Sequence, residues 1–129
     1  MAGKTILIVE DNERNRKLVK VILKAKGYVI LEAEDASSAF CELEKTIPDL
    51  ILMDIGLPQM SGLELTKQIK LREEIKGVPI VALTAHAMIG DREGILAAGC
   101  DDYISKPIDI NEFPKTIAEI LEKAEKLRK

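Results

Sequence analysis

The chain has 129 residues, of which 47% are hydrophobic and 32% are charged, and its net charge at pH 7 is −3. This composition excludes a disordered tail, a collagen-like rod and a disulfide-rich miniprotein. The length predicts one domain over residues 1–129, with a core from about 4 to 123 and no output domain. A protein that binds nucleic acid through its overall charge would be basic, so we expect no nucleic-acid partner.

Short apolar runs alternate with longer segments of helical periodicity. In chain order we expect a strand at 6–9, a helix at 13–26, a strand at 29–31, a helix that ends before Pro48, a strand at 50–53, a helix from Ser61 to about Arg72, a strand at 79–83, a helix at 87–98, a strand at 102–105 and a helix capped by Asp109. Gly27 is expected to end the first helix, and Ser61 with Glu64 to form a capping box.

Apolar residues at helical spacing predict which helix faces are buried. The expected inner positions are Leu18, Val19, Ile22, Leu23 and Ala25 in the first helix, Phe40, Leu43 and Ile47 in the second, and Ile110, Phe113, Ile117, Ile120, Leu121 and Ala124 in the last. Gly90 and Gly94 weaken the fourth helix, so we expect amides 87–98 to exchange faster than those of the last helix.

Cysteine and histidine are sparse, and the N-terminus carries no leader signature. Cys41 and Cys100 form no CxxC pair and His86 is the only histidine, which excludes a metal centre built from Cys and His ligands. Both thiols are expected to be reduced and mostly buried. No apolar run approaches the roughly 20 residues that span a bilayer, so we predict a cytoplasmic protein without a membrane partner.

Five strand–helix pairs in strict alternation predict a parallel sheet with right-handed crossovers and helices on both faces. Such sheets bind ligands at the carboxyl ends of their strands. Five polar residues lie at those ends in this sequence: Glu10, Asp11, Asp54, Thr84 and Lys106. None of them is needed to complete a core, so we expect them to converge on one functional site.

This set of side chains suits phosphoryl transfer. Three crowded carboxylates repel one another unless a cation intervenes, and Mg²⁺ binds a few carboxylates while it keeps several waters. One carboxylate can then accept a phosphoryl group, while Lys106, Thr84 and nearby backbone amides neutralise the phosphoryl oxygens. The groups needed to form an aspartyl phosphate are therefore present.

Five segments carry a resemblance to a known family. They are IVEDN at 8–12, PDLILMD at 48–54, LPQMSG at 57–62, PIVALTA at 79–85 and YISKPI at 103–108. In this order they closely resemble the receiver domain of two-component response regulators, in the CheY-like superfamily, over nearly the whole chain. The first and last segments resemble the single-domain DivK group of cell-cycle regulators. The resemblance implies a flavodoxin-like (βα)5 fold, a doubly wound parallel five-stranded sheet in the order 2-1-3-4-5 with helices on both faces.

The resemblance also implies a phosphoacceptor and a metal site. Asp54 would accept the phosphoryl group. Mg²⁺, for which Mn²⁺ can substitute, would bind Asp11, Asp54, the backbone carbonyl of Gly56 and, through water, Glu10. The backbone of Gly56 and Ala85 would contact the phosphoryl oxygens.

Three further residues have roles implied by the resemblance. Lys106 would pair with the phosphoryl group, in a catalytic set with Asp54 and Thr84. Thr84 would move toward a phosphoryl oxygen, and the Tyr103 side chain would turn inward once Thr84 has moved. The bond between Lys106 and Pro107 resembles a cis peptide of the family that aims the lysine.

Two positions depart from the pattern of the family. Gly56, two residues after Asp54, often has a longer side chain in relatives, and His86 lies two residues after Thr84. We hypothesise that Gly56 leaves open the path of water to the acyl phosphate and that His86 partly shields it. Alternatively, Gly56 meets a backbone need such as positive φ and His86 is merely exposed. The sequence leaves both possibilities open.

These expectations combine into a phosphorylation-controlled switch of a two-component phosphorelay that slowly dephosphorylates itself and is not a conventional enzyme. A sensor histidine kinase or a histidine phosphotransfer protein would supply the phosphoryl group. The face of the fourth helix, fifth strand and fifth helix would then shift to bind a downstream effector protein or kinase.

Three other functions compete with the switch. A phosphatase that forms an aspartyl phosphate would usually have a second Asp where this chain has Gly56. A nucleotide- or flavin-binding module would need a glycine-rich turn, and Glu10 with Asp11 would instead repel a phosphate. A degenerate receiver used only as a scaffold would not keep all the positions of the site filled.

Overall fold

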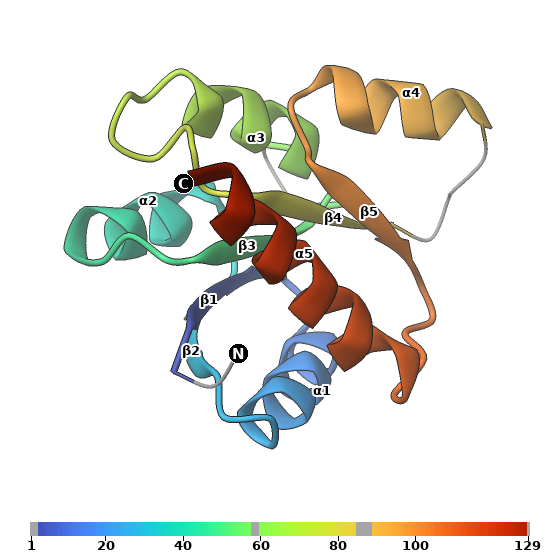
Figure 1. Ribbon diagram of the computed structural model, residues 1–129. Helices are drawn as coiled ribbons and strands as arrows, with labels where there is room; N and C mark the ends of the chain where they lie inside the picture. Colours follow the sequence, from blue (N-terminus) through green and yellow to red (C-terminus); the bar gives the residue numbers. More distant parts are fainter. Residues whose placement is uncertain (1–2, 58–59, 85–88, 129) are drawn as a thin grey trace.

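The computed structural model describes residues 3–57, 60–84 and 89–128 (Figure 1). Its elements alternate along the chain as β1 (Thr5–Val9), α1 (Glu13–Lys24), β2 (Val29–Ala33), α2 (Ala36–Lys45), β3 (Leu50–Asp54), α3 (Gly62–Lys70), β4 (Ile80–Thr84), α4 (Ile89–Ala97), β5 (Asp102–Ser105) and α5 (Glu112–Arg128). Every expected strand and helix is present, and only the ends of the elements shift.

The five strands form one parallel sheet in the order β2-β1-β3-β4-β5. β1 pairs with both β2 and β3, and its last residue Val9 lies opposite Ala33 on one side and Met53 on the other. The chain therefore moves outward from β1 to β2, crosses back to β3 and continues to β5. This reversal between β1 and β3 confirms the predicted doubly wound, flavodoxin-like topology.

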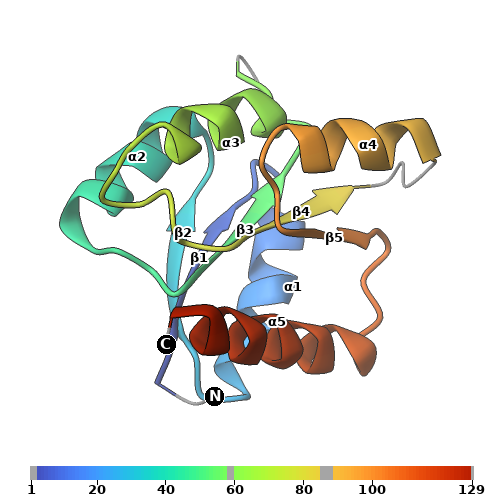
Figure 2. The ribbon, with the colours of Figure 1, turned by 45° about the horizontal axis from the view of Figure 1, so that its top comes forward.

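Helices cover both faces of the sheet because successive residues of a strand point to opposite sides. In β1, Ile6 and Ile8 join the core under α1 and α5, whereas Leu7 and Val9 join the core under α2, α3 and α4. Figure 2 shows α1 and α5 below the sheet and the other three helices above it. The central strands β3 and β4 are buried along their whole length, so their polar residues occur only at their carboxyl ends.

Side-chain bonds to the backbone define several helix ends. Ser61 caps α3 by accepting a hydrogen bond from the Glu64 amide at 3.2 Å, which confirms one of the two bonds of the predicted capping box. Asp35 and Ser38 form a reciprocal capping box at α2 that had not been predicted. Gly27 lies just beyond α1 with a φ of 90°, where its lack of a side chain lets the chain turn toward β2.

Some apolar residues predicted to be buried are exposed. The buried residues of α1 are Val19, Ile22 and Leu23, whereas Leu18 is exposed. Ala25, Ile47 and Ile110 are exposed because α1 ends at residue 24, α2 ends at residue 45 and α5 begins only at residue 112. Hydrophobic periodicity identified these helices correctly but extended them past their real ends.

The two thiols differ in environment. Cys100 is buried as predicted, but Cys41 is exposed on α2, so the prediction of two buried thiols was wrong for Cys41. Ala39 and Leu43 form the buried side of that helix and leave Cys41 facing outward. Within the described ranges, no helix combines the length and the hydrophobicity needed to cross a bilayer.

Candidate functional site

The carboxyl ends of β1 and β3 place acidic residues side by side. Asp54 is the last residue of β3, and Glu10 directly follows the neighbouring strand β1. The Glu10 amide donates to the carbonyl of Ala33 at 3.0 Å, which continues the pairing of β1 with β2 past its end. Asp11 comes next in the chain, so three carboxyl groups reach the same edge of the sheet.

These acids and one lysine form a compact cluster. One carboxylate oxygen from each of Glu10, Asp11 and Asp54 lies within 4.8 Å of the others. The ammonium nitrogen of Lys106 lies 3.0 Å from Glu10 Oε1 and 3.5 Å from Asp54 Oδ1. Glu10 and Asp54 are only 1% and 7% exposed, whereas Asp11 is exposed. The cluster is therefore closed at Glu10 and open at Asp11, and it brings together four of the five residues that the sequence predicted would converge: Glu10, Asp11, Asp54 and Lys106.

Lys106 directly follows β5, and this strand positions it next to the cluster. The Lys106 amide donates to the carbonyl of Thr84 at 2.7 Å, which extends the pairing of β4 with β5 beyond Ser105. The peptide bond between Lys106 and Pro107 is cis, in agreement with the resemblance noted above. A pocket of about 140 Å³ adjoins the cluster and is lined by Glu10, Asn15, Leu18, Lys106, Pro107 and Ile108.

Burial and crowding shift the protonation of the cluster. Burial, together with a hydrogen bond to Asp54, raises the pKa of Glu10 to about 7 although Lys106 opposes the shift. Burial alone would also raise the pKa of Asp54, but hydrogen bonds from Glu10 and the Gly56 amide, with the charge of Lys106, outweigh it and lower that pKa. Burial would lower the pKa of Lys106, and its bond to Glu10 and the charge of Asp54 reverse that effect and raise it. The pKa of Glu10 is therefore raised while that of Asp54 is lowered, so a proton taken up by this pair binds to Glu10 in preference to Asp54.

The donor set fits a hard divalent cation. All three acids offer oxygen ligands, two from a buried wall and one from the open side, which is the kind of site where Mg²⁺ binds carboxylates and retains water. Burial, together with the nearby Asp54, raises the pKa of Glu10, and a cation bound among the three acids would favour its ionised form. Glu10, Asp11 and Asp54 are therefore the residues that could hold such an ion.

A backbone group of the loop after β3 contacts the side chain of Asp54. The Gly56 amide donates to Asp54 Oδ1 at 3.0 Å. Gly56 does not have a positive φ, and a Cβ at this position would lie 3.6 Å from Asp54 Oδ1, an ordinary contact distance. A left-handed backbone is therefore not the reason for glycine here, and the missing side chain leaves the space beside Asp54 open.

Two residues that shape the site were not predicted. Gly62, the first residue of α3, donates to the carbonyl of Ile55, and a Cβ there would overlap the carbonyl oxygen of Asp54. Arg16 on α1 donates to the carbonyl oxygen of Glu10 at 2.8 Å. A glycine at the start of a helix, where the backbone needs no extra freedom, was a signal for close packing at Gly62. No signal marked Arg16, because charged residues on helices usually face solvent.

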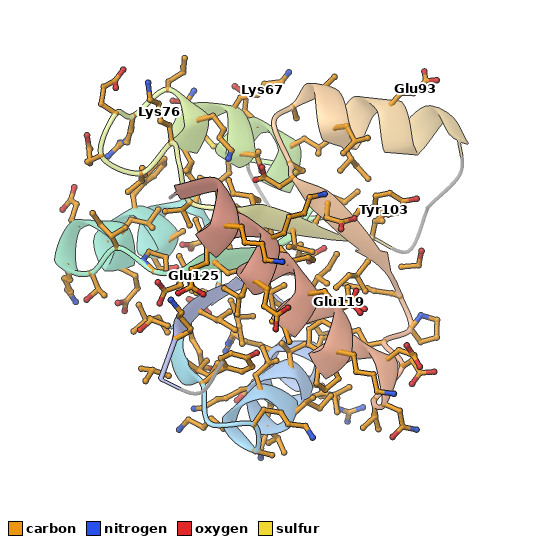
Figure 3. The ribbon with its side chains drawn as sticks, in the orientation of Figure 1. Lys67, Lys76, Glu93, Tyr103, Glu119 and Glu125 are labelled. Atoms are coloured by element: carbon orange, nitrogen blue, oxygen red, sulfur yellow. The ribbon has the colours of Figure 1, made fainter. Side chains whose placement is uncertain are left out.

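The remaining predicted residues follow at β4 and β5. Thr84, the last residue of β4, is 1% exposed, and Tyr103 is half-buried on the edge strand β5 against the core shared with α4. Figure 3 labels Tyr103 on this strand, which Figure 2 shows between α4 and α5. Ala85 and His86 lie outside the described residues.

The sequence matches a family model described as the response regulator receiver domain over residues 6–118. The chain belongs to this family. The receiver is 47% identical over 118 residues to the polar-differentiation response regulator DivK of Brucella ovis, in an alignment that covers 92% of this chain and 96% of that protein. Its place in two-component signalling follows from the family, whose members interact with histidine kinases and downstream effectors.

Solved receivers share the fold. The receiver domain of the sensor histidine kinase PA1611 from Pseudomonas aeruginosa, which has a magnesium ion coordinated in its active-site cleft, matches with a TM-score of 0.85 and 38% identity over 94% of this chain and 99% of that one. The chemotaxis protein CheY4 of Vibrio cholerae matches with a TM-score of 0.85 and 28% identity over 92% and 98% of the two chains. These similarities agree with the strand order and layers described above.

Proposed function

We propose that this receiver is a phosphorylation-controlled switch of a two-component phosphorelay and that Asp54 is its phosphoacceptor. The observation that carries the proposal is the position of the Asp54 carboxylate, which ends a rigid central strand between two other acids and Lys106. The lowered pKa of Asp54, due to hydrogen bonds and Lys106 that outweigh its burial, keeps this carboxylate ionised and nucleophilic.

The chemical step is a transfer from a phosphohistidine donor. A carboxylate oxygen of Asp54 forms a bond to phosphorus while the bond from phosphorus to the donor imidazole nitrogen breaks. The imidazole leaves with the electron pair of that bond and takes up a proton. Lys106 and the Gly56 amide, which both bond Asp54 Oδ1, orient the carboxylate, and Lys106 is placed to pair with the negative charge of the phosphoryl group.

We assign the metal site to Asp11, Asp54, the Gly56 carbonyl and, through water, Glu10. Mg²⁺ bound there supplies positive charge for the phosphoryl oxygens. The chain itself contributes the buried wall of Glu10 and Asp54 and the exposed carboxylate of Asp11. The magnesium ion in the PA1611 receiver, which shares this fold, supports the assignment.

The output surface is proposed to be the face of α4, β5 and α5, with Thr84 and Tyr103 as the residues that couple it to Asp54. Thr84 ends β4 next to Asp54 on β3, and Tyr103 lies on β5 beside that strand. Phosphorylation would shift an equilibrium between two states of this face by as much as it stabilises one of them over the other. Faster amide exchange in α4 than in α5 would support such a mobile output face, and equal protection would argue against it.

A direct test uses acetyl phosphate and Mg²⁺ as the phosphodonor mixture, with the adduct detected by intact-protein mass spectrometry. The wild type should gain one phosphoryl group and Asp54→Asn none. Asp49→Asn is a matched control, since Asp49 precedes the same strand at its other end and accepts the Thr5 amide instead. Equal labelling of Asp54→Asn and wild type would exclude Asp54 as the acceptor.

A further inference from the structure

Arg16 links the acidic cluster to the second strand of the sheet. Its Nη1 donates to the carbonyl oxygen of Glu10 at 2.8 Å, and its Nε donates to Glu32 Oε1 at 3.3 Å. Glu32, on β2, also accepts a bond from Lys20 Nζ at 2.9 Å. The Arg16 side chain is only 17% exposed. The guanidinium is therefore held between a carboxylate and a backbone carbonyl of the site.

The carbonyl that Arg16 binds belongs to the peptide group that joins Glu10 to Asp11. The other backbone group of Glu10, its amide, is already bound to Ala33. Because a peptide group is planar, a bond to its carbonyl also fixes the direction in which the chain enters Asp11. Beyond Asp11 the chain has only Asn12 before α1 begins. Asn12 caps α1, and its amide donates to Glu10 Oε2 at 3.4 Å, so the 2.8 Å bond from Arg16 is the shorter of the two side-chain bonds that orient the Glu10–Asp11 connection.

We propose that Arg16 is a positioning residue of the metal site, which holds the Glu10–Asp11 peptide so that the Asp11 carboxylate stays within reach of Asp54. The inference rests on the proposed Mg²⁺ site and adds a residue that does not touch the ion. Arginine suits the role because its planar group presents several donors and can bond a carbonyl and a carboxylate at once.

The charge of Arg16 acts in the opposite direction to its proposed role. A positive side chain near a cation site repels the cation, so removal of the charge alone should strengthen Mg²⁺ binding. Removal of the positioning bond should weaken it, because Asp11 is then free to turn away from Asp54. The sign of the change in affinity therefore separates the two effects.

The test is a titration of the full chain with Mg²⁺ alone, followed by isothermal calorimetry. Arg16→Met is expected to raise the dissociation constant about tenfold, the lower part of the range for residues that orient metal ligands. Lys20→Met is the matched control, since it removes the same charge from the same helix and the same Glu32 partner without touching Glu10. Its affinity should equal that of the wild type or exceed it.

A metal-free measurement accompanies the titration. The Asp11 amide should exchange faster with solvent in Arg16→Met than in Lys20→Met, since only the first variant releases the Glu10–Asp11 peptide. If Arg16→Met does not fold, Arg16→Lys replaces it. This variant keeps the positive charge, but an ammonium group cannot reproduce the geometry by which the guanidinium bonds both Glu32 and the Glu10 carbonyl. The dissociation constant for Mg²⁺ should therefore rise about threefold.

The outcomes distinguish the inference from the proposed function. Mg²⁺ binding by Arg16→Met as tight as in the wild type, or an equal weakening in Arg16→Met and Lys20→Met, overturns the role of Arg16 and leaves the metal site intact. An unchanged affinity in Arg16→Lys, where that variant is used, does the same. Failure of the wild type to bind Mg²⁺ would overturn the metal site and the role of Arg16 together.

Discussion

Aspartates lie at both ends of the sheet, but they have different partners. At the amino end, Asp49 accepts the amide of Thr5, the first residue of β1, at 2.8 Å. Asp101 accepts the amide of Ile80, the first residue of β4, at 2.8 Å and the ammonium group of Lys70 at 3.1 Å. These carboxylates complete the backbone hydrogen bonding of two strands, so they stabilise the fold.

At the carboxyl end the acids face one another and Lys106. Asp54 accepts the Gly56 amide at 3.0 Å and Glu10 accepts the Asn12 amide at 3.4 Å, and both donors lie two residues further along the chain and not in a neighbouring strand. Burial, together with the neighbouring Asp54, raises the pKa of Glu10, and the ionised cluster costs stability until a cation compensates its negative charges. A carboxylate is thus available for chemistry where the fold does not use it to complete a strand.

Loss of Lys106, which contacts Asp54, should affect phosphorylation far more than loss of Lys70, which contacts Asp101. Lys106→Met should slow phosphorylation by acetyl phosphate about 100-fold, because the transferred group loses a positive charge that stabilises it. Lys70→Met removes a lysine that pairs with Asp101 at the other end of the sheet and should leave the rate unchanged. The measurement is the rate of adduct formation at a fixed Mg²⁺ concentration. Equal slowing in both variants would contradict a role that is specific to Lys106.

The raised pKa of Glu10 predicts how Mg²⁺ binding depends on pH. Below about 7 Glu10 is protonated, and a cation must compete with that proton, so affinity should rise by about tenfold between pH 6 and pH 8. Glu10→Gln cannot titrate and should flatten this dependence. Asp49→Asn, altered at the amino end, should follow the wild-type curve. A titration of each protein with Mg²⁺ at several pH values checks the prediction, and a steep curve for Glu10→Gln would contradict it.

Stability should change in opposite directions at the two ends. Asp101→Ala leaves the amide of Ile80 without this carboxylate partner and should cost about 1–2 kcal/mol in the free energy of unfolding. Glu10→Gln removes the buried carboxyl group whose pKa is raised to about 7, and it should stabilise the metal-free protein by about 1 kcal/mol at pH 8, where the wild-type group is ionised. Urea unfolding at pH 8 without Mg²⁺ measures both variants, and a loss of stability in Glu10→Gln would show that the acidic cluster does not strain the fold.

The smallest expected effect concerns the lifetime of the phosphorylated state. Gly56→Gln places a side chain beside Asp54 and should slow dephosphorylation about threefold. The corresponding change in the activation free energy is well under the roughly 1.4 kcal/mol of a tenfold change in rate. Gly77→Gln is the matched control, because a side chain there meets no atom within 4 Å at the other end of the sheet. His86→Ala should accelerate the reaction if this residue shields the acyl phosphate. Loss of the adduct over time gives each rate, and unchanged rates in Gly56→Gln and His86→Ala would refute the shielding hypothesis.

Much of the fold and the site could be predicted because the responsible signals are local. The apolar runs of β3 and β4 identify buried strands, and the residue that ends or follows each strand lies at one edge by the geometry of parallel sheets. That reasoning located Asp54, Thr84 and Lys106 without coordinates. It could not locate Gly62 or Arg16, since their roles depend on backbone groups that approach them only after the chain folds.

The sequence by itself determined the alternation of strands and helices and the identity of the polar residues at the strand ends, because periodicity and residue type are properties of neighbouring positions. Only the tertiary structure decided that Glu10 carries a raised pKa, that Arg16 turns inward to its carbonyl and that Leu18 stays outside the core. Each of these depends on distances between segments far apart in the chain, and such distances arise only when the elements pack.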